Sequence, residues 1–193
     1  MRNVLPLTKR QKRQLAAIGV SVDAFAFFQR FVGHDFSFIT KREGRDWALA
    51  RHRTPLNNSL LVSHLSGRRW VGTGCRWDAA VRRFVTDYIA IDLDHHGDIE
   101  DLVDRYDRVV RALGAPTFVF RSSENGGLHV YYFLTEPVEL HRLRRPNARY
   151  GAVVELLAAH DLIEANGSVE VYPRGHYRVR GTQNRLRLPF GRG

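Results

Sequence analysis

Two aspartates one residue apart end an apolar, β-favouring run, and their spacing is the first feature of this sequence that points to chemistry. Asp92 and Asp94 lie in AIDLDHHGD, directly after FVTDYI. Side chains at positions i and i+2 of a strand face the same way, roughly 6.6 to 7 Å apart at Cα. A divalent cation would resolve the repulsion between the two carboxylates, because Mg²⁺ is commonly held by one or two carboxylates and substrate phosphates. The alternative is that both acids lie at the exposed end of the strand and begin a loop.

The segment SSENGGLHVYY is a second candidate, because it places a serine, two glycines and a histidine within a few residues. It contains Ser123, Gly127 and His129. Glycine lets backbone amides approach phosphate oxygens without an intervening Cβ, so these residues together are suited to hold a triphosphate. The same pattern is typical of a hairpin turn selected for its conformation, and on its own the segment favours that simpler interpretation.

Two further features each have two interpretations. Glu170 lies between two valines on a predicted strand, where an inward-pointing acid needs either an arginine partner or a metal ion. The triplet Asp94-His95-His96 resembles the signature of DHH-type phosphoesterases, but the further Asp and His motifs of that family have no place in this sequence. We therefore expect His95 and His96 to be solvated loop residues.

The composition is basic: 30 Lys and Arg against 20 Asp and Glu give a formal net charge of +10 over 193 residues. This excess favours a polyanionic partner, most simply nucleic acid, over a merely soluble basic surface. The single cysteine, Cys75, excludes an internal disulfide and a cysteine-cluster zinc site and suggests a reducing compartment. No apolar run approaches the roughly 20 residues that span a membrane, so we expect a cytoplasmic protein with no membrane partner.

The elements that must position these residues follow from hydrophobic periodicity. In the N-terminal part we expect two helices within 8–32, a β-hairpin over 35–52 with its turn at Glu43-Gly44, a helix from Thr54 to Gly67 and a strand over 68–74. The remainder predicts the order β-α-β-β-α-β, at 84–94, 99–114, 117–123, 128–134, 139–159 and 168–173, with further strand-like pieces at 177–180 and 185–190. This order, with an antiparallel pair in its middle, predicts an α+β fold: an RRM-like (ferredoxin-like) antiparallel sheet with helices packed on it.

The length indicates a single domain over 1–193. We expect an N-terminal subdomain of helices and a hairpin over 1–53. A core would follow over 54–193, and its RRM-like part would span 84–191.

Three motifs, in this order, resemble the archaeo-eukaryotic primase superfamily, in particular the primase-polymerases of plasmids, phages and mobile elements. They are the acidic pair Ile91-Asp92-Leu93-Asp94, the Ser123, Gly127 and His129 motif, and the strand Val169-Glu170-Val171. The closing RLRLPFG resembles the RLPxG tail of the plasmid and phage branches, and His64-Leu65-x-Gly67 resembles a segment that precedes their acidic strand. The resemblance extends from Leu56 to Gly191, which is most of the chain.

The resemblance implies a DNA-dependent primase-polymerase, a nucleotidyltransferase that makes or extends primers on single-stranded DNA from NTPs or dNTPs. Asp92, Asp94 and Glu170 would then bind two Mg²⁺ or Mn²⁺ ions. Further contacts to the phosphates of the incoming nucleotide would come from Ser123, His129, the amides near Gly127, and Arg187 or Arg174. The zinc-binding insert of the family has no counterpart here, so no zinc site is expected. A helicase or primer-initiation module is expected to follow in a longer replication protein.

Two alternatives use the same residues differently. One is a metal-dependent phosphoesterase or nuclease that uses the same acids, and the other is a non-catalytic replication-initiator domain that binds DNA on a similar sheet. Neither alternative needs a pocket for a nucleoside triphosphate, so the Ser…Gly-x-His motif favours the primase interpretation over both.

Overall fold

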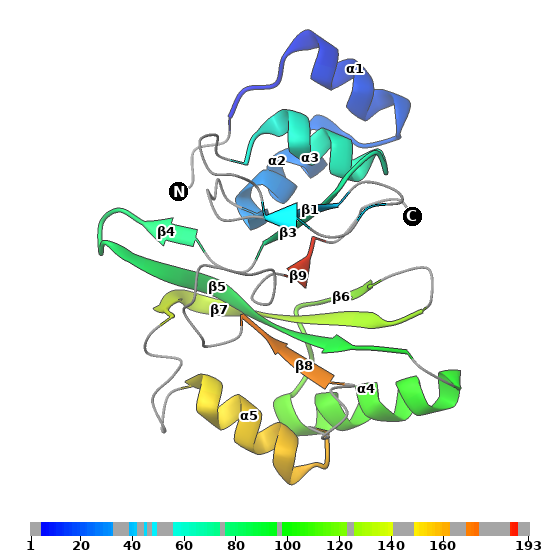
Figure 1. Cartoon of the computed structure of the whole chain (residues 1–193), viewed down its shortest axis with the longest axis vertical. Coiled ribbons are helices and arrows are strands. Elements are labelled where there is room, and N and C mark those ends of the chain that lie inside the picture. The colour runs from blue at the N-terminus through cyan, green and yellow to red at the C-terminus, as the bar shows by residue number, and fades with distance from the viewer. Residues whose placement is uncertain are drawn as a thin grey trace. The chain divides into compact units, whose positions relative to one another are not determined.

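A computed structural model describes most of the chain (Figure 1), and the described residues are 5–32, 39–41, 45, 48–49, 56–73, 76–95, 98–122, 126–140, 149–162, 169–173 and 186–188. The chain divides into two compact units, one formed by 1–77 with 179–193 and the other by 78–178. The predicted extent of the domain, 1–193, stays a prediction, because two compact units can belong to one domain. None of the described helices is long and apolar enough to cross a membrane.

The first unit contains a four-stranded antiparallel sheet in the order β2-β1-β3-β9. Its strands are β1 (Ile39–Lys41), β2 (Ala48–Leu49), β3 (Trp70–Thr73) and β9 (Leu186–Arg187), and its helices are α1 (Lys9–Ala17), α2 (Val22–Val32) and α3 (Asn58–Leu65). The predicted hairpin is confirmed, because Ile39 of β1 pairs with Leu49 of β2. Its predicted turn, Glu43-Gly44, lies outside the described residues.

Helix α3 begins later than the sequence predicted. The side chain of Asn57 accepts a hydrogen bond from the Leu60 backbone N–H at 3.1 Å and so caps the helix, whereas Thr54 lies outside the described residues. His64 of this helix is fully buried, its Nδ1 accepts a hydrogen bond from the Val71 N–H at 3.2 Å, and its ring stacks on Phe28. A histidine singled out by the resemblance thus helps to hold α2, α3 and β3 together.

The second unit contains the predicted RRM-like sheet. Its core strands are β5 (Arg83–Leu93), β6 (Phe118–Arg121), β7 (Leu128–Glu139) and β8 (Val169–Tyr172). They lie in the order β8-β5-β7-β6, with every neighbouring pair antiparallel. In chain order, a helix follows the first of these strands, β5, and the third, β7, which is the ferredoxin-like arrangement. The predicted fold class is therefore confirmed. The short strand β4 (Arg76–Asp78), at the boundary of the two units, is hydrogen-bonded to β5.

Both helices of this unit, α4 (Ile99–Leu113) and α5 (Arg149–Ala159), cover the same face of the sheet (Figure 1). Alternate residues of the strands point into this layer because side chains of a strand alternate between its faces. The buried layer consists of Ile89, Ile91, Leu93, Val130, Val169 and Val171 from the strands, with Leu102, Val109, Leu157 and Leu162. The opposite face is therefore the one that carries the intervening residues, including Asp92.

Helix α5 was predicted to begin at Glu139, and this boundary is wrong. Strand β7 continues to Glu139, which pairs with Val85, and its neighbour Val138 pairs with Thr86. The described part of α5 begins at Arg149. Val138 and Glu139 thus belong to β7 because they pair with the first half of β5, although their local sequence has a helical pattern.

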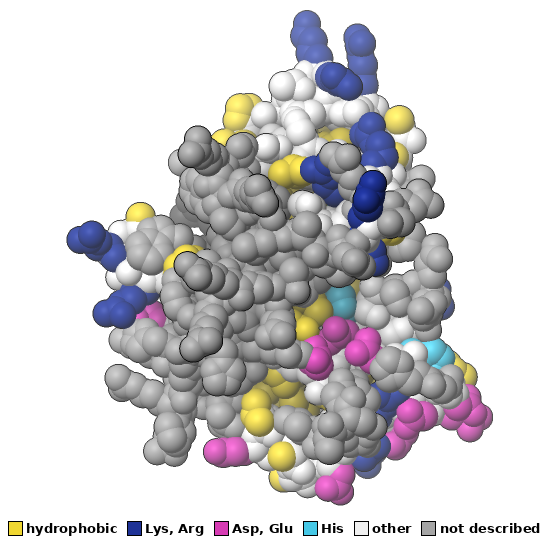
Figure 2. Space-filling model, viewed as in Figure 1, with side chains coloured by type: hydrophobic (Ala, Val, Ile, Leu, Met, Phe, Trp, Pro, Cys, Tyr) yellow, Lys and Arg dark blue, Asp and Glu magenta, His cyan; other side chains and the backbone are white. Residues whose placement is uncertain are grey.

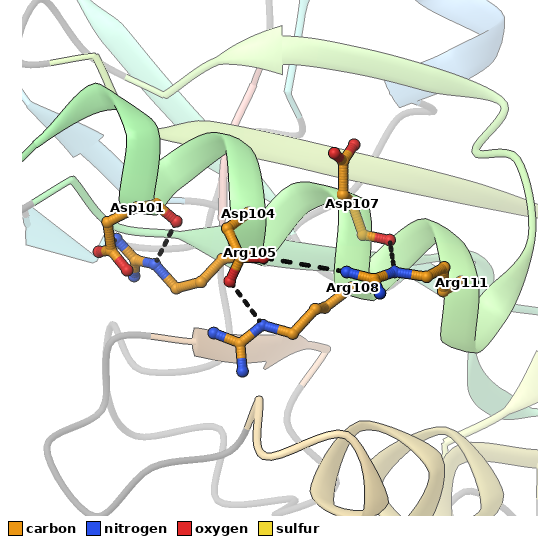
Figure 3. Close-up of polar contacts among 6 residues, drawn as sticks. All are labelled: Asp101, Asp104, Arg105, Asp107, Arg108 and Arg111. Atoms are coloured by element: carbon orange, nitrogen blue, oxygen red, sulfur yellow. Dashed lines mark hydrogen bonds and ion pairs between the residues drawn. The ribbon is translucent and has the colours of Figure 1, made fainter.

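Helix α4 begins and ends as predicted. The carboxylate of Asp98 accepts a hydrogen bond from the Glu100 N–H at 3.3 Å, and the helix ends at Gly114, whose φ is 82°. The helix carries a series of ion pairs (Figure 3): the buried Arg105 with Asp101, and Arg108 with Asp104, each at 2.9 Å. Such pairs spaced by four residues stabilise a helix by about 0.2–0.5 kcal/mol each.

Candidate active site on the second sheet

Three of the predicted site residues form one row across the second sheet. Asp92 on β5 pairs directly with His129 on β7 and with Glu170 on β8. Directly paired residues of antiparallel strands point to the same face, with Cβ atoms roughly 4.5–5.5 Å apart. Because Ile91 and Leu93 pack under the helices, this row lies on the face that the helices leave uncovered. The structure thus brings together side chains from three separate motifs.

At the centre of the row, Asp92 contacts the imidazole of His129. The Oδ1 of Asp92 lies 3.3 Å from the Nε2 of His129, and the two side chains are 15% and 5% exposed. At the end of the row, the carboxylate of Glu170 accepts a hydrogen bond from the hydroxyl of Tyr172 at 2.5 Å. Each member is therefore oriented by a neighbour on the sheet, which is how a site holds its groups in place before a ligand binds.

Asp94 lies one position beyond the end of β5 and is half-buried. Among the described residues, no three His, Cys, Asp or Glu side chains are grouped closely enough to hold a metal ion. The structure therefore brings Asp92 and Glu170 into one row but does not join Asp94 to them as a compact cluster. Whether the three acids bind metal together stays a prediction.

The chemistry of these side chains nevertheless suits a divalent cation. Asp92 and Glu170 face each other across β5 and β8, and like charges directly opposite on neighbouring strands destabilise a sheet. Carboxylate oxygens are hard ligands of the kind that Mg²⁺ and Mn²⁺ prefer. A cation between Asp92 and Glu170 would turn an unfavourable pair into a favourable one, so these residues fit the predicted metal.

The two glycines of the second motif bring the turn between β6 and β7 close to the end of β5. Gly126 has φ 94°, which a residue with a Cβ rarely adopts. A Cβ on Gly127 would lie 2.9 Å from the carbonyl oxygen of Leu93 and would collide with the hydroxyl of Ser122. Gly127 is therefore required for packing beside Asp94, and its predicted role in phosphate binding stays a prediction.

His95 is not the solvated loop residue that we expected. It is half-buried, and its ring lies against the turn, because a Cβ on Gly126 would be 3.4 Å from its Cδ2. Its Nδ1 is buried and has no hydrogen-bond partner within the part of the chain that the structure describes. The close packing of the glycine turn explains the difference, and His96 lies outside the described residues.

The structure does not test the remaining predicted contacts. Ser123 and Arg174 lie outside the described residues. Arg187 lies on β9 in the first unit, where its backbone pairs with Gly72, and its side chain is outside the described part. The three predicted phosphate contacts therefore stay predictions.

Tyr131 is a neighbour of the row that the sequence reasoning missed. It lies two residues after His129, on the same face, and its ring centroid is 6.3 Å from that of His129. Burial, and then the nearby Tyr88 and Asp92, raise the pKa of its hydroxyl well above the ordinary value of 10.0. The period of two along β7 was a sufficient signal, because it places every second residue after His129 beside the acids.

Comparison with known families identifies the class of protein. The Replicase family model matches residues 68–165, about half of the chain, and the matched part includes Asp92, Asp94, Gly127 and His129. The chain belongs to the Replicase family. This is a family of proteins of the archaeo-eukaryotic primase-polymerase type that mobile elements carry. The resemblance seen in the sequence is thereby confirmed, and the chain is associated with replication. A search of curated proteins gives no match.

Proposed function

We propose that this protein is a DNA-dependent primase-polymerase that transfers nucleotides to primers on single-stranded DNA. The observation that carries the proposal is the row in which Asp92 lies between His129 and Glu170. Two of these residues, Asp92 and His129, belong to the part of the chain that matches the Replicase family. We expect the protein to act in the cytoplasm of a bacterial or archaeal host.

Asp92, Glu170 and Asp94 would hold two Mg²⁺ or Mn²⁺ ions in this proposal. When bound, such ions activate a primer 3′-hydroxyl and offset the charge of the departing pyrophosphate. The chain's contribution is to present carboxylates from two neighbouring strands on one face. Asp94, directly after β5, would reach the same ions from the end of the strand.

His129 would contact the phosphates of the incoming NTP or dNTP. Its contact with Asp92 holds the imidazole in place on this face of the sheet. Ser123, the amides near Gly127, and Arg187 or Arg174 would supply the remaining phosphate contacts. The basic surface of the chain would bind the template backbone.

The decisive experiment measures incorporation of labelled nucleotides on primed and unprimed single-stranded DNA with Mg²⁺ or Mn²⁺. We expect products that lengthen with time for the natural chain and none for Asp92→Asn. Asp107→Asn is the matched control, because Asp107 is an exposed residue of α4 away from the row. It should leave incorporation unchanged.

Two other results would contradict the proposal. A template that shortens without any incorporation would indicate a metal-dependent nuclease. Binding of DNA that neither EDTA nor Asp92→Asn affects, without incorporation even on a pre-annealed primer, would indicate a replication-initiator domain without catalytic activity.

A further inference from the structure

Aromatic side chains cover the sheet face beside the row of acids. Phe120 on β6 pairs with His129, and Phe118 pairs with Tyr131. Since His129 itself pairs with Asp92, these rings share the face of the candidate active site. They extend the row from the acids to the outer strand of the sheet.

The rings on this face form two groups: buried rings that support the others from below, and rings that are exposed to solvent. Tyr131 is 1% exposed and meets Phe120 edge-on, with ring centroids 5.6 Å apart and an interplanar angle of 74°. Phe133 likewise meets Phe118 edge-on, at 5.8 Å and 86°. Phe118 and Phe120 lie nearly parallel to each other, with 22° between their planes and 5.9 Å between centroids. Phe118 is 37% exposed and Phe120 is partly exposed.

The position of the two rings at a sheet edge is unusual for a purely structural cluster. Among the described strands, β6 pairs only with β7, so its other side is an edge. Proteins usually protect edge strands with charged residues or proline rather than with exposed aromatic rings. Exposed aromatic rings in a row therefore point to a ligand.

We propose that Phe118 and Phe120 form a stacking platform for consecutive unpaired bases of a single-stranded DNA template. Aromatic rings on a sheet face bind single strands in this way, because every base has a flat face that can stack. The net charge of +10 complements the phosphates of a strand. Two rings in succession suit successive bases of a strand better than the one base of a free nucleotide.

That the bound strand is a template rests on the proposed function, but binding itself can be tested separately. We would measure the affinity for a labelled oligothymidine by fluorescence anisotropy in EDTA, at several salt concentrations. Phe118→Leu and Phe120→Leu should each weaken binding at least about five-fold, while the salt dependence stays unchanged because the phosphate contacts remain. Phe27→Leu, at an exposed phenylalanine of α2, is the matched control and should bind normally.

A second measurement protects the test against misfolding. Phe120→Trp and Phe118→Trp keep an aromatic surface, so they should bind oligothymidine like the natural chain. They should also quench 2-aminopurine placed in the oligonucleotide. The double variant Phe118→Leu with Phe120→Leu completes the test. If it binds oligothymidine as tightly as the natural chain does, the platform is overturned. The platform is also overturned if the variants lose affinity for free nucleotide only, because the two rings would then bind the base of the incoming nucleotide. Incorporation that persists in variants without stacking would overturn the platform and leave the proposed function intact. Stacking without incorporation would support the platform and contradict the proposed function.

Discussion

At the scale of single residues, the candidate site depends on contacts that leave little room for change. Gly127 is the sharpest case, because a Cβ there would meet the backbone of β5 next to Asp94. We expect Gly127→Ala to lower the free energy of unfolding by about 1–3 kcal/mol and to abolish most nucleotide incorporation. Gly114→Ala is the control: it has positive φ but open space around it, so it should cost stability and keep incorporation. Chemical denaturation and primer extension of both variants would decide this, and equal incorporation by the two would contradict the packing role.

Tyr131 gives a second prediction at this scale, on alkaline stability. Its pKa is raised in the folded protein, first by burial and then by Tyr88 and Asp92. The folded state therefore holds this proton more tightly than the unfolded state does. The resulting stability is fully present below pH 10, the unfolded pKa, and is lost as the pH rises above it. Tyr131→Phe should lose less free energy of unfolding than the natural chain between about pH 9 and pH 11. If the free energy of unfolding falls with pH equally in both proteins, Tyr131 is not the source of the pH dependence.

At the scale of elements, α1 is a basic helix with one side packed against the first unit. Leu15 is buried, and Gln11 donates a hydrogen bond to Ser59 of α3 at 3.1 Å. Its charged residues Lys9, Arg10, Lys12 and Arg13 are exposed, and Figure 2 shows lysine and arginine side chains gathered over this helix. This arrangement leaves the charges available to the phosphates of a bound strand.

We expect Lys12→Gln with Arg13→Gln to weaken binding of single-stranded DNA and to reduce its salt dependence. The slope of log affinity against log salt should fall by roughly 0.7 for each phosphate that the variant helix no longer neutralises. Arg111→Gln is the matched control, because the charge of Arg111 lies 3.9 Å from that of Asp104. An unchanged slope for the α1 variant would assign this helix a packing role only.

Periodicity predicted the elements of the second unit well, because their alternation is local. The boundaries that failed depend on distant partners. Val138 and Glu139 belong to β7 because they pair with Thr86 and Val85, and nothing in the local sequence 136–142 shows that pairing. The start of α3 failed for a different reason, since both Thr54 and Asn57 are good capping residues and only the structure shows that Asn57 caps the helix.

At the scale of the whole molecule, the sequence could predict which residue types form the site but not which of them meet. Asp92 and Asp94 looked like a pair because they are close in sequence, whereas the structure pairs Asp92 with His129 and Glu170. Register between strands decides this, and register follows from the packing of the entire apolar layer. The aromatic platform was missed for the same reason, because only strand order places Phe118 and Phe120 on the face of the acids.

The opposed acids make a final prediction about the stability of the entire chain. Without metal, Glu170→Gln should raise the free energy of unfolding by about 0.2–1 kcal/mol, because like charges no longer face each other across β5 and β8. Asp92→Asn also weakens the contact with His129, so this variant is compared for metal binding only. With millimolar Mn²⁺, the natural chain should melt at a higher temperature than in EDTA, since an ion that binds only the folded state stabilises it. Both variants should lose most of this rise, and Asp107→Asn should keep it. A rise of equal size in all four proteins would mean that the ion binds elsewhere. The paired acids would then be structural, and the two-metal mechanism would lose its physical basis.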